Sequence, residues 1–325
     1  MTGNEDELHA TLPRVLDMLR TGIMEPLSQC LTRLGHEMAA LIPLGTLGLL
    51  PLHAAIASSA PAFAYAPSAR ALSHAVAGRA RAQDAVPSLL AVGNPQRDAT
   101  NALPFALAET RVAAQATSWS GKTVLVGPEA CISNVVSAMG AATHLHFACH
   151  GIFRPSDPIE SALQLADQQK ITLRMLLARD VSLSAPRLAV LSACQTANVE
   201  FRALPDEVLG LPSGLLLAGV PGIVATMWPV DDRAAAFFSQ RFYEELFVAE
   251  REPAAAVAAA QHWLRDASAV ELQTRLKSMR AALVTGDDEA DAAVSKTWRA
   301  LVSGPADDRP FANPEFWAAF TYVGI

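Results

Sequence analysis

Two segments of the chain each place a reactive side chain directly after a run of apolar residues. The first covers residues 143–151 and ends in His150 and Gly151, and the second covers residues 187–196 and contains Cys194. A cysteine attacks as its thiolate, and a free thiol is mostly protonated near neutral pH. A neighbouring imidazole can take that proton, so the two segments together indicate a cysteine–histidine catalytic pair.

The expected placement of the pair follows from strand geometry. The carboxyl ends of neighbouring parallel strands meet at one edge of a sheet, where terminal residues come within roughly 5–10 Å of each other. We expect His150 to act as general acid/base and Cys194 as nucleophile, with the N–H groups of Gly151 and Cys194 forming an oxyanion hole. Each motif alone is also typical of a turn histidine or a buried core thiol. Their joint occurrence at two strand ends favours catalysis.

Further histidines and cysteines near the pair raise the alternative of a metal site. His144, His146 and His150 share one face of the predicted strand, whereas Cys149 points to the other. We therefore predict no metal, expect His146 to pack or hydrogen-bond beneath His150, and assign Cys149 to the core. No cofactor is predicted either, because the relaxed phosphate-loop pattern at residues 116–123 stands in the order helix, loop, strand, the reverse of a working site.

Apolar runs alternate with segments of helical periodicity along most of the chain. This alternation predicts an α/β fold with a mostly parallel sheet covered by helices on both faces. Residues 44–86 allow no assignment. The predicted strands cover residues 38–42, 88–92, 123–126, 143–149, 161–166, 187–193, 222–227 and 316–323, and the predicted helices cover residues 106–117, 131–139, 172–179, 206–218, 231–249, 253–266 and a charged insertion at 268–300.

The first part of the sequence predicts a short N-terminal helical segment. Apolar residues recur at helical spacing over residues 7–37, and Gly22 and Pro26 predict a break between two helices. We expect residues 1–37 to pack on a single domain that covers residues 38–325.

Composition excludes several classes of protein. Of 325 residues, 51% are hydrophobic and 18% are charged, which supports a large buried core. A net charge of −7 without any basic run argues against binding to nucleic acid or to an anionic membrane. The longest apolar stretch, residues 41–56, is broken by prolines and glycines and is too short for a membrane span. An acidic start and four cysteines without paired spacing favour a cytoplasmic location.

The two motifs, HFACHG at 146–151 and LSACQT at 191–196, strongly resemble the CHAT domain, a branch of the caspase/separase-like cysteine peptidases. The likeness spans roughly residues 38–325. It implies a caspase-like sheet and a His150/Cys194 dyad that hydrolyses peptide bonds through a thioester. Family members often carry Glu after the cysteine, where this chain has Gln195. Further matching segments, in order, are residues 41–45, 50–55, 161–167, 206–212, 217–232, 242–243, 260–264 and 317–324.

The resemblance also implies a biological setting. We expect a cysteine endopeptidase that cleaves a protein substrate in a regulated bacterial defence or cell-death pathway, with a regulatory or sensor protein as a further partner. A catalytically silent CHAT scaffold that binds proteins through the same groove is the alternative. A cysteine hydrolase of small amides or esters is a weaker one.

Substrate choice requires side chains beside the dyad. Asp232 follows the strand at 222–227 and is a candidate acid for a pocket that takes Arg or Lys before the cleaved bond. Trp228 is a candidate wall of that pocket and otherwise a core residue. Asp231 and Asp232 alternatively cap the next helix, which is at least as good an explanation for Asp231.

Overall fold

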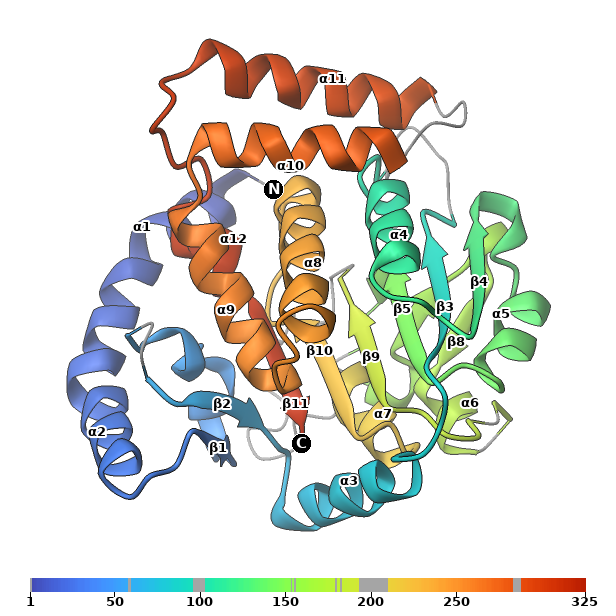
Figure 1. Ribbon diagram of the computed structural model, residues 1–325. Helices are drawn as coiled ribbons and strands as arrows, with labels where there is room; N and C mark the ends of the chain where they lie inside the picture. Colours follow the sequence, from blue (N-terminus) through green and yellow to red (C-terminus); the bar gives the residue numbers. More distant parts are fainter. Residues whose placement is uncertain are drawn as a thin grey trace.

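An eight-stranded sheet forms the centre of the computed structural model (Figure 1). The structure describes residues 2–57, 60–95, 103–152, 154, 156–178, 180–181, 183–192, 210–282 and 288–325. The strand order is β1-β2-β11-β10-β9-β5-β3-β4. Its strands are β1 (Met38–Leu41), β2 (Ala62–Tyr65), β3 (Ser88–Gly93), β4 (Gly121–Val126), β5 (His144–Ala148), β9 (Leu188–Leu191), β10 (Gly222–Thr226) and β11 (Phe320–Gly324).

The sheet consists of two parallel blocks that meet at one antiparallel pair. β10, β9, β5, β3 and β4 run in one direction, and β11, β2 and β1 run in the other. The predicted mostly parallel sheet is therefore confirmed. Every residue of β5, β9 and β10 is buried, because helices cover both faces of these strands and their sequences are correspondingly apolar throughout.

Two of the predicted strands need correction. The run at 161–166 forms β7 (Ala162–Gln164), which belongs to a separate antiparallel sheet with β6 (Gly151–Ile152) and β8 (Lys170–Thr172). The last strand begins at Phe320 instead of 316, because residues Pro314–Trp317 form the short helix α12. Asn313 caps this helix by accepting the N–H of Glu315, which starts a helical turn where the apolar pattern alone suggests a strand.

Helices lie on both faces of the sheet. Right-handed crossovers place α4 (Ala106–Gln115) on one face, and α5 (Ile132–Met139) and α7 (Leu211–Leu217) on the other. In Figure 1, α8 (Asp232–Phe247) lies between α4 and α9 (Pro253–Asp266), and its contacts with both helices agree. The charged insertion is a hairpin of α10 (Ala269–Ala282) and α11 (Asp288–Ser303) across the top of α4 and α8.

The N-terminal segment forms a nearly continuous helical arm. α1 (Thr2–Leu19) passes through a π-helical turn (Arg20–Met24) into α2 (Glu25–Arg33), so the predicted break is a local change of helix type. Pro26 lies just after the π-helical turn, where its missing N–H interrupts the α-helical hydrogen bonding. Leu12 and Leu16 of α1 are buried in the same core as the sheet. The division at residues 37/38 stays a prediction.

The segment that the sequence left unassigned contains β2 and α3 (Ala69–Arg81), and α6 (Leu173–Leu177) follows β8. The Ser68 side chain accepts the N–H of Ala71 and thereby starts α3. Within the described part of the chain, no helix combines the length and the hydrophobicity that crossing a bilayer requires.

Candidate active site

A cavity of about 170 Å³ opens at the carboxyl ends of β5, β9 and β10. β5 and β9 pair in parallel with Phe147 opposite Leu191, and the N–H of Ser192 donates to the Phe147 carbonyl at 3.2 Å. His150 and Ser192 therefore leave neighbouring strands on the same side of the sheet. The lining residues are Leu103, Ala106, Glu109, Ala148, His150, Ser192, Pro229, Val230, Asp232 and Ala235.

The small antiparallel sheet holds the chain directly after β5. The His150 carbonyl accepts the N–H of Gln164 at 2.8 Å, and Gly151 pairs with Leu163 of β7. The backbone on both sides of the His150 side chain is thus fixed by regular structure. Cys194 lies outside the described residues, so the His150/Cys194 pair and its oxyanion hole remain predictions.

A buried polar network lies beneath the cavity. Glu109 of α4 is 1% exposed, and its Oε1 accepts the Ser239 hydroxyl proton at 2.5 Å. The fully buried His146 places its Nε2 3.3 Å from the same oxygen, outside hydrogen-bond geometry but within ion-pair distance. Its Nδ1 is 2.9 Å from the Tyr243 Oη. The predicted hydrogen bonding of His146 is confirmed, with α8 as the partner.

Tyr243 enters this network as a protonated phenol. Burial, reinforced by the negative charge of Glu109, raises the Tyr243 pKa well above its usual value. The phenol therefore keeps its proton and is a neutral hydrogen-bond partner of His146 Nδ1. Ser239 donates its hydroxyl hydrogen to Glu109. None of the described residues that line the cavity is a lysine or an arginine.

Asp232 contributes a second carboxyl group to the cavity. Its Oδ2 accepts the N–H of Phe105, at the start of α4, at 2.6 Å. Burial raises the Asp232 pKa to about 7, and the charges of Glu109 and Asp231 add to the increase, whereas the Phe105 N–H and Arg233 oppose it. Near neutral pH this group is divided between acid and carboxylate. A cation entering the cavity would favour the carboxylate.

Asp231 and Trp228, the other two residues considered for the substrate pocket, do not line the cavity. The Asp231 side chain accepts the N–H groups of Arg233 and Ala234, so it is the N-cap of α8, as its position in the sequence suggested. The Trp228 indole donates its N–H to the Glu315 carbonyl at 2.8 Å, and Trp228 is not among the residues that line the cavity. The structure brings Asp232, but not Trp228, to His150.

Helical periodicity explains why α8 supplies so much of the site. Asp232, Ala235, Ser239 and Tyr243 are spaced by three or four residues and share one helix face. The first two line the cavity, and the last two contact the Glu109–His146 network. Sequence reasoning did not find Glu109, Ser239 or Tyr243. The available signal was polar residues in register with Asp232 on the apolar face of that helix.

The other side chains weighed as metal ligands are part of the packing. His144 contacts the rings of Trp119 and Phe247, and burial lowers its pKa to about 3, so it is neutral. Cys149 is completely buried. Across the described ranges, no three His, Cys, Asp or Glu side chains gather as metal ligands would.

Comparison with known proteins places these observations in a family context. The family model of the CHAT domain matches residues 13–325. No sequence among the curated proteins matches this chain.

Three solved structures are similar in fold. The Arg-specific cysteine proteinase gingipain R (RgpB) aligns with a TM-score of 0.52 at 8% identity, over 98% of this chain and 75% of that chain. The complex of pro- and mature domains of RgpB from Porphyromonas gingivalis gives 0.50 and 10%, over 98% and 76%. A separase–securin complex from Saccharomyces cerevisiae gives 0.48 and 11%, over 88% and 15%. The similarity to gingipain R confirms the predicted caspase-like fold.

Proposed function

Because this chain belongs to the CHAT domain family, we propose that it is a cysteine endopeptidase that uses His150 and Cys194. The Cys194 thiolate attacks the carbonyl carbon of the scissile peptide bond, and the Gly151 and Cys194 N–H groups stabilise the oxyanion. His150 holds the thiol proton and gives it to the leaving amine. Water, deprotonated by His150, then hydrolyses the thioester and releases the acid product.

The observation that carries this proposal is the register of β5 and β9. The paired residues in this ladder differ by 44 in number, as in Phe147 and Leu191. His150 and Cys194 differ by the same amount. A ladder that continued at this offset would set the two side by side, about 4.8 Å apart at the backbone. The cavity lined by His150 and Ser192, two residues before Cys194, supports the same arrangement.

The proposed substrate carries Arg or Lys before the cleaved bond. The cavity beside His150 contains the carboxyl groups of Asp232 and Glu109, and the described lining contains no lysine or arginine to balance them. A guanidinium or ammonium group entering this cavity would pair with both at low local dielectric. We assign Asp232 as the residue that contacts the basic side chain.

The proposed setting is a reducing cytoplasm, in a regulated bacterial defence or cell-death pathway with a protein substrate and a regulatory or sensor protein as partners. The free thiols of Cys30 and Cys131 support the reducing compartment. The pathway rests on the family resemblance.

The catalytic assignment is tested with Cys194→Ala and His150→Ala. We expect each to abolish the new protein N-termini that the wild-type chain produces in a proteome, with exposed Cys30→Ser as the matched control. A peptidyl-arginine electrophile should label the wild type and the control, but not Cys194→Ala. Cleavage that persists in Cys194→Ala would overturn the dyad. Wild-type protein that neither cleaves nor becomes labelled would indicate the scaffold alternative.

The basic specificity is tested with Asp232→Asn. Removing one carboxylate from a desolvated ion pair should lower kcat/KM for Arg- and Lys-containing peptides by about 100-fold. Asp231→Asn is the matched control, because Asn is as good an N-cap as Asp. An equal loss for peptides with a neutral residue before the cut would show that Asp232 supports the fold of the site and does not select the substrate.

A further inference from the structure

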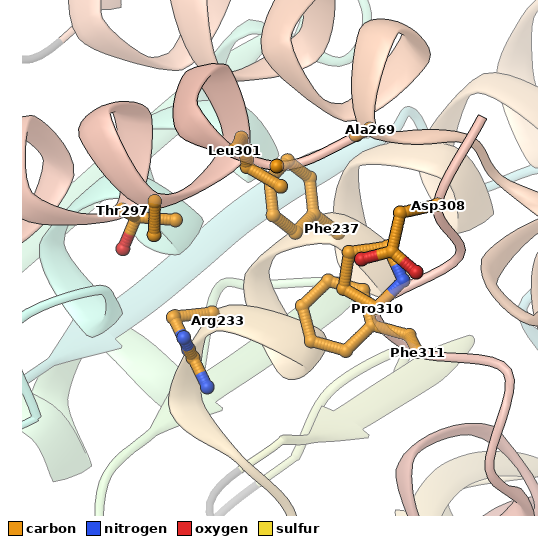
Figure 2. A pocket seen from close by; sticks show the side chains of 10 residues that line it. Arg233, Phe237, Ala269, Thr297, Leu301, Asp308, Pro310 and Phe311 are labelled. Atoms are coloured by element: carbon orange, nitrogen blue, oxygen red, sulfur yellow. The ribbon is translucent and has the colours of Figure 1, made fainter. Parts of the chain in front are cut away.

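A second cavity lies on the opposite side of the first turn of α8 (Figure 2). It measures about 190 Å³ and is enclosed by α8, the start of α10, the end of α11 and the segment that follows α11. Phe237, Leu301 and Phe311 form buried apolar walls, whereas Arg233 and Asp308 lie at its edge. The full lining is Arg233, Phe237, Ala269, Thr297, Ala300, Leu301, Gly304, Asp308, Pro310 and Phe311.

The two cavities share the start of α8 as their partition. Asp232 and Ala235 face the cavity at His150, whereas Arg233 faces the second cavity. Successive helical side chains point about 100° apart, so neighbours diverge to different sides. Phe237 stands four residues after Arg233 and hence on the same face. Because a helix with its side chains is about 10–12 Å across, an extended polypeptide spans the distance between the two cavities with roughly three or four residues.

The lining determines what the second cavity can hold. A cavity of about 150 Å³ with apolar walls binds benzene, so this one has room for a single Leu, Met or Phe side chain. The Arg233 guanidinium is already paired with Asp231 at 2.6 Å, so an occupant needs no charge to neutralise it. Ala300, Gly304 and Asp308 are exposed, which places the mouth of the cavity at the surface.

We propose that the second cavity binds an apolar side chain of the same polypeptide substrate, within about four residues of the cleaved bond. The inference rests on the proposed endopeptidase function and adds a second specificity determinant to it. The α10–α11 hairpin then acts as a recognition element, because α11 and the segment after it supply most of the wall. The substrate class becomes a polypeptide with a basic residue at the cut and an aliphatic or aromatic residue nearby.

Gly304 offers a way to fill the cavity without disturbing the fold. A Cβ added there would meet only the Ala300 carbonyl oxygen, at an ordinary 3.7 Å. Gly304→Leu therefore places a side chain at the mouth, and Gly304→Ala is the matched control. The assays are hydrolysis of a single-residue acyl-arginine coumarin amide and of an arginine peptide library that varies the flanking positions.

We expect the wild type to prefer Leu, Met or Phe over Ala at one library position by about 10- to 100-fold. Gly304→Leu should reduce that preference to about threefold or less, with Ala peptides and the acyl-arginine amide cleaved at the wild-type rate. Gly304→Ala should keep the preference. If Gly304→Leu lowers the melting temperature, Ala300→Leu at the same mouth replaces it.

Three results would overturn the inference. A wild type that cleaves the acyl-arginine amide but shows no apolar preference in the library would do so while leaving the proposed function intact. An unchanged preference in both folded filling variants would do the same. Hydrolysis of neither substrate by the wild type would instead overturn the proposed function, and this inference with it.

Discussion

Two buried histidines, one in strand β5 and the other in the short helical turn that precedes β2, make the same hydrogen bond with tyrosine. His146 Nδ1 lies 2.9 Å from the Tyr243 Oη, and His53 Nδ1 lies 2.9 Å from the Tyr65 Oη. The histidines are 0% and 6% exposed. They differ in what the second ring nitrogen meets. His146 faces the Glu109 carboxylate, whereas His53 lies among neutral backbone groups.

This difference separates a supporting role at the site from a purely structural one. Burial lowers the His53 pKa to about 4, with partial compensation from the backbone of Phe320 and Ala318, so this ring is neutral, and its Nδ1 bonds Tyr65 of β2. The pair in β5 and α8 instead ends in a carboxylate that lines the candidate active site. The same histidine–tyrosine hydrogen bond thus has two roles. The group that faces the second ring nitrogen determines whether the pair supports the site or only the fold.

Removing the Glu109 carboxylate beside His146 should have the largest effect on activity. Glu109→Gln takes one negative charge from the cavity and keeps an oxygen that can accept the Ser239 hydroxyl proton. We expect kcat/KM for an acyl-arginine substrate to fall about 30- to 100-fold, or roughly 2–3 kcal/mol. The matched substrate is acyl-citrulline, which is neutral and of the same shape. Equal losses on both substrates would assign Glu109 to folding alone.

The His53–Tyr65 pair should affect the stability of the protein at acidic pH. An unfolded histidine has a pKa near 6.5, and His53 in the folded chain has a lowered pKa of about 4. Its contribution to stability is therefore present above pH 6.5 and is lost as the pH falls toward 4. Between pH 7 and pH 5 the wild type should lose about 2 kcal/mol more than His53→Gln in urea unfolding. Parallel pH curves for the two proteins would contradict this assignment.

The smallest effects should come from the two tyrosines, compared directly. Tyr65→Phe removes a group that bonds the N–H of His53 as well as its ring, and Tyr243→Phe removes a single ring partner. Each should cost about 1–2 kcal/mol in unfolding free energy. Tyr243→Phe alone should change the arginine-to-citrulline ratio, by about threefold. A similar change of the arginine-to-citrulline ratio in Tyr65→Phe would show that the two histidine–tyrosine pairs do not differ in their relation to the site.

Most of the fold was predictable, because long apolar strands alternate with well-spaced helices from residue 88 onward. The prediction was incomplete or wrong where the apolar pattern does not distinguish a strand from a helix. Residues 62–81 are rich in alanine, which suits both β2 and α3 and distinguishes neither. β11 is preceded by α12, which occupies part of the same apolar run.

The site was predictable only in part. His150 and Asp232 follow strands and carry reactive groups, so their positions in the sequence sufficed to bring them to one cavity. Glu109 stands in α4 like any surface charge, and nothing local indicates its burial. Its role depends on a contact with Ser239, 130 residues later in the chain. Such long-range partners are set by the packing of α4 on α8, which periodicity does not reveal.

The position of β11 has a consequence for synthesis on the ribosome. β11 lies between β2 and β10 and is the strand that joins the two blocks of the sheet. β1 and β2 are therefore synthesised early, but they can join the β10 block of the sheet only after residues 320–324 have been synthesised. At roughly 5–20 residues per second this delay is on the order of tens of seconds. The nascent chain cannot join β2 to β10, and so leaves these two strand edges unpaired with each other's block, until β11 has been made.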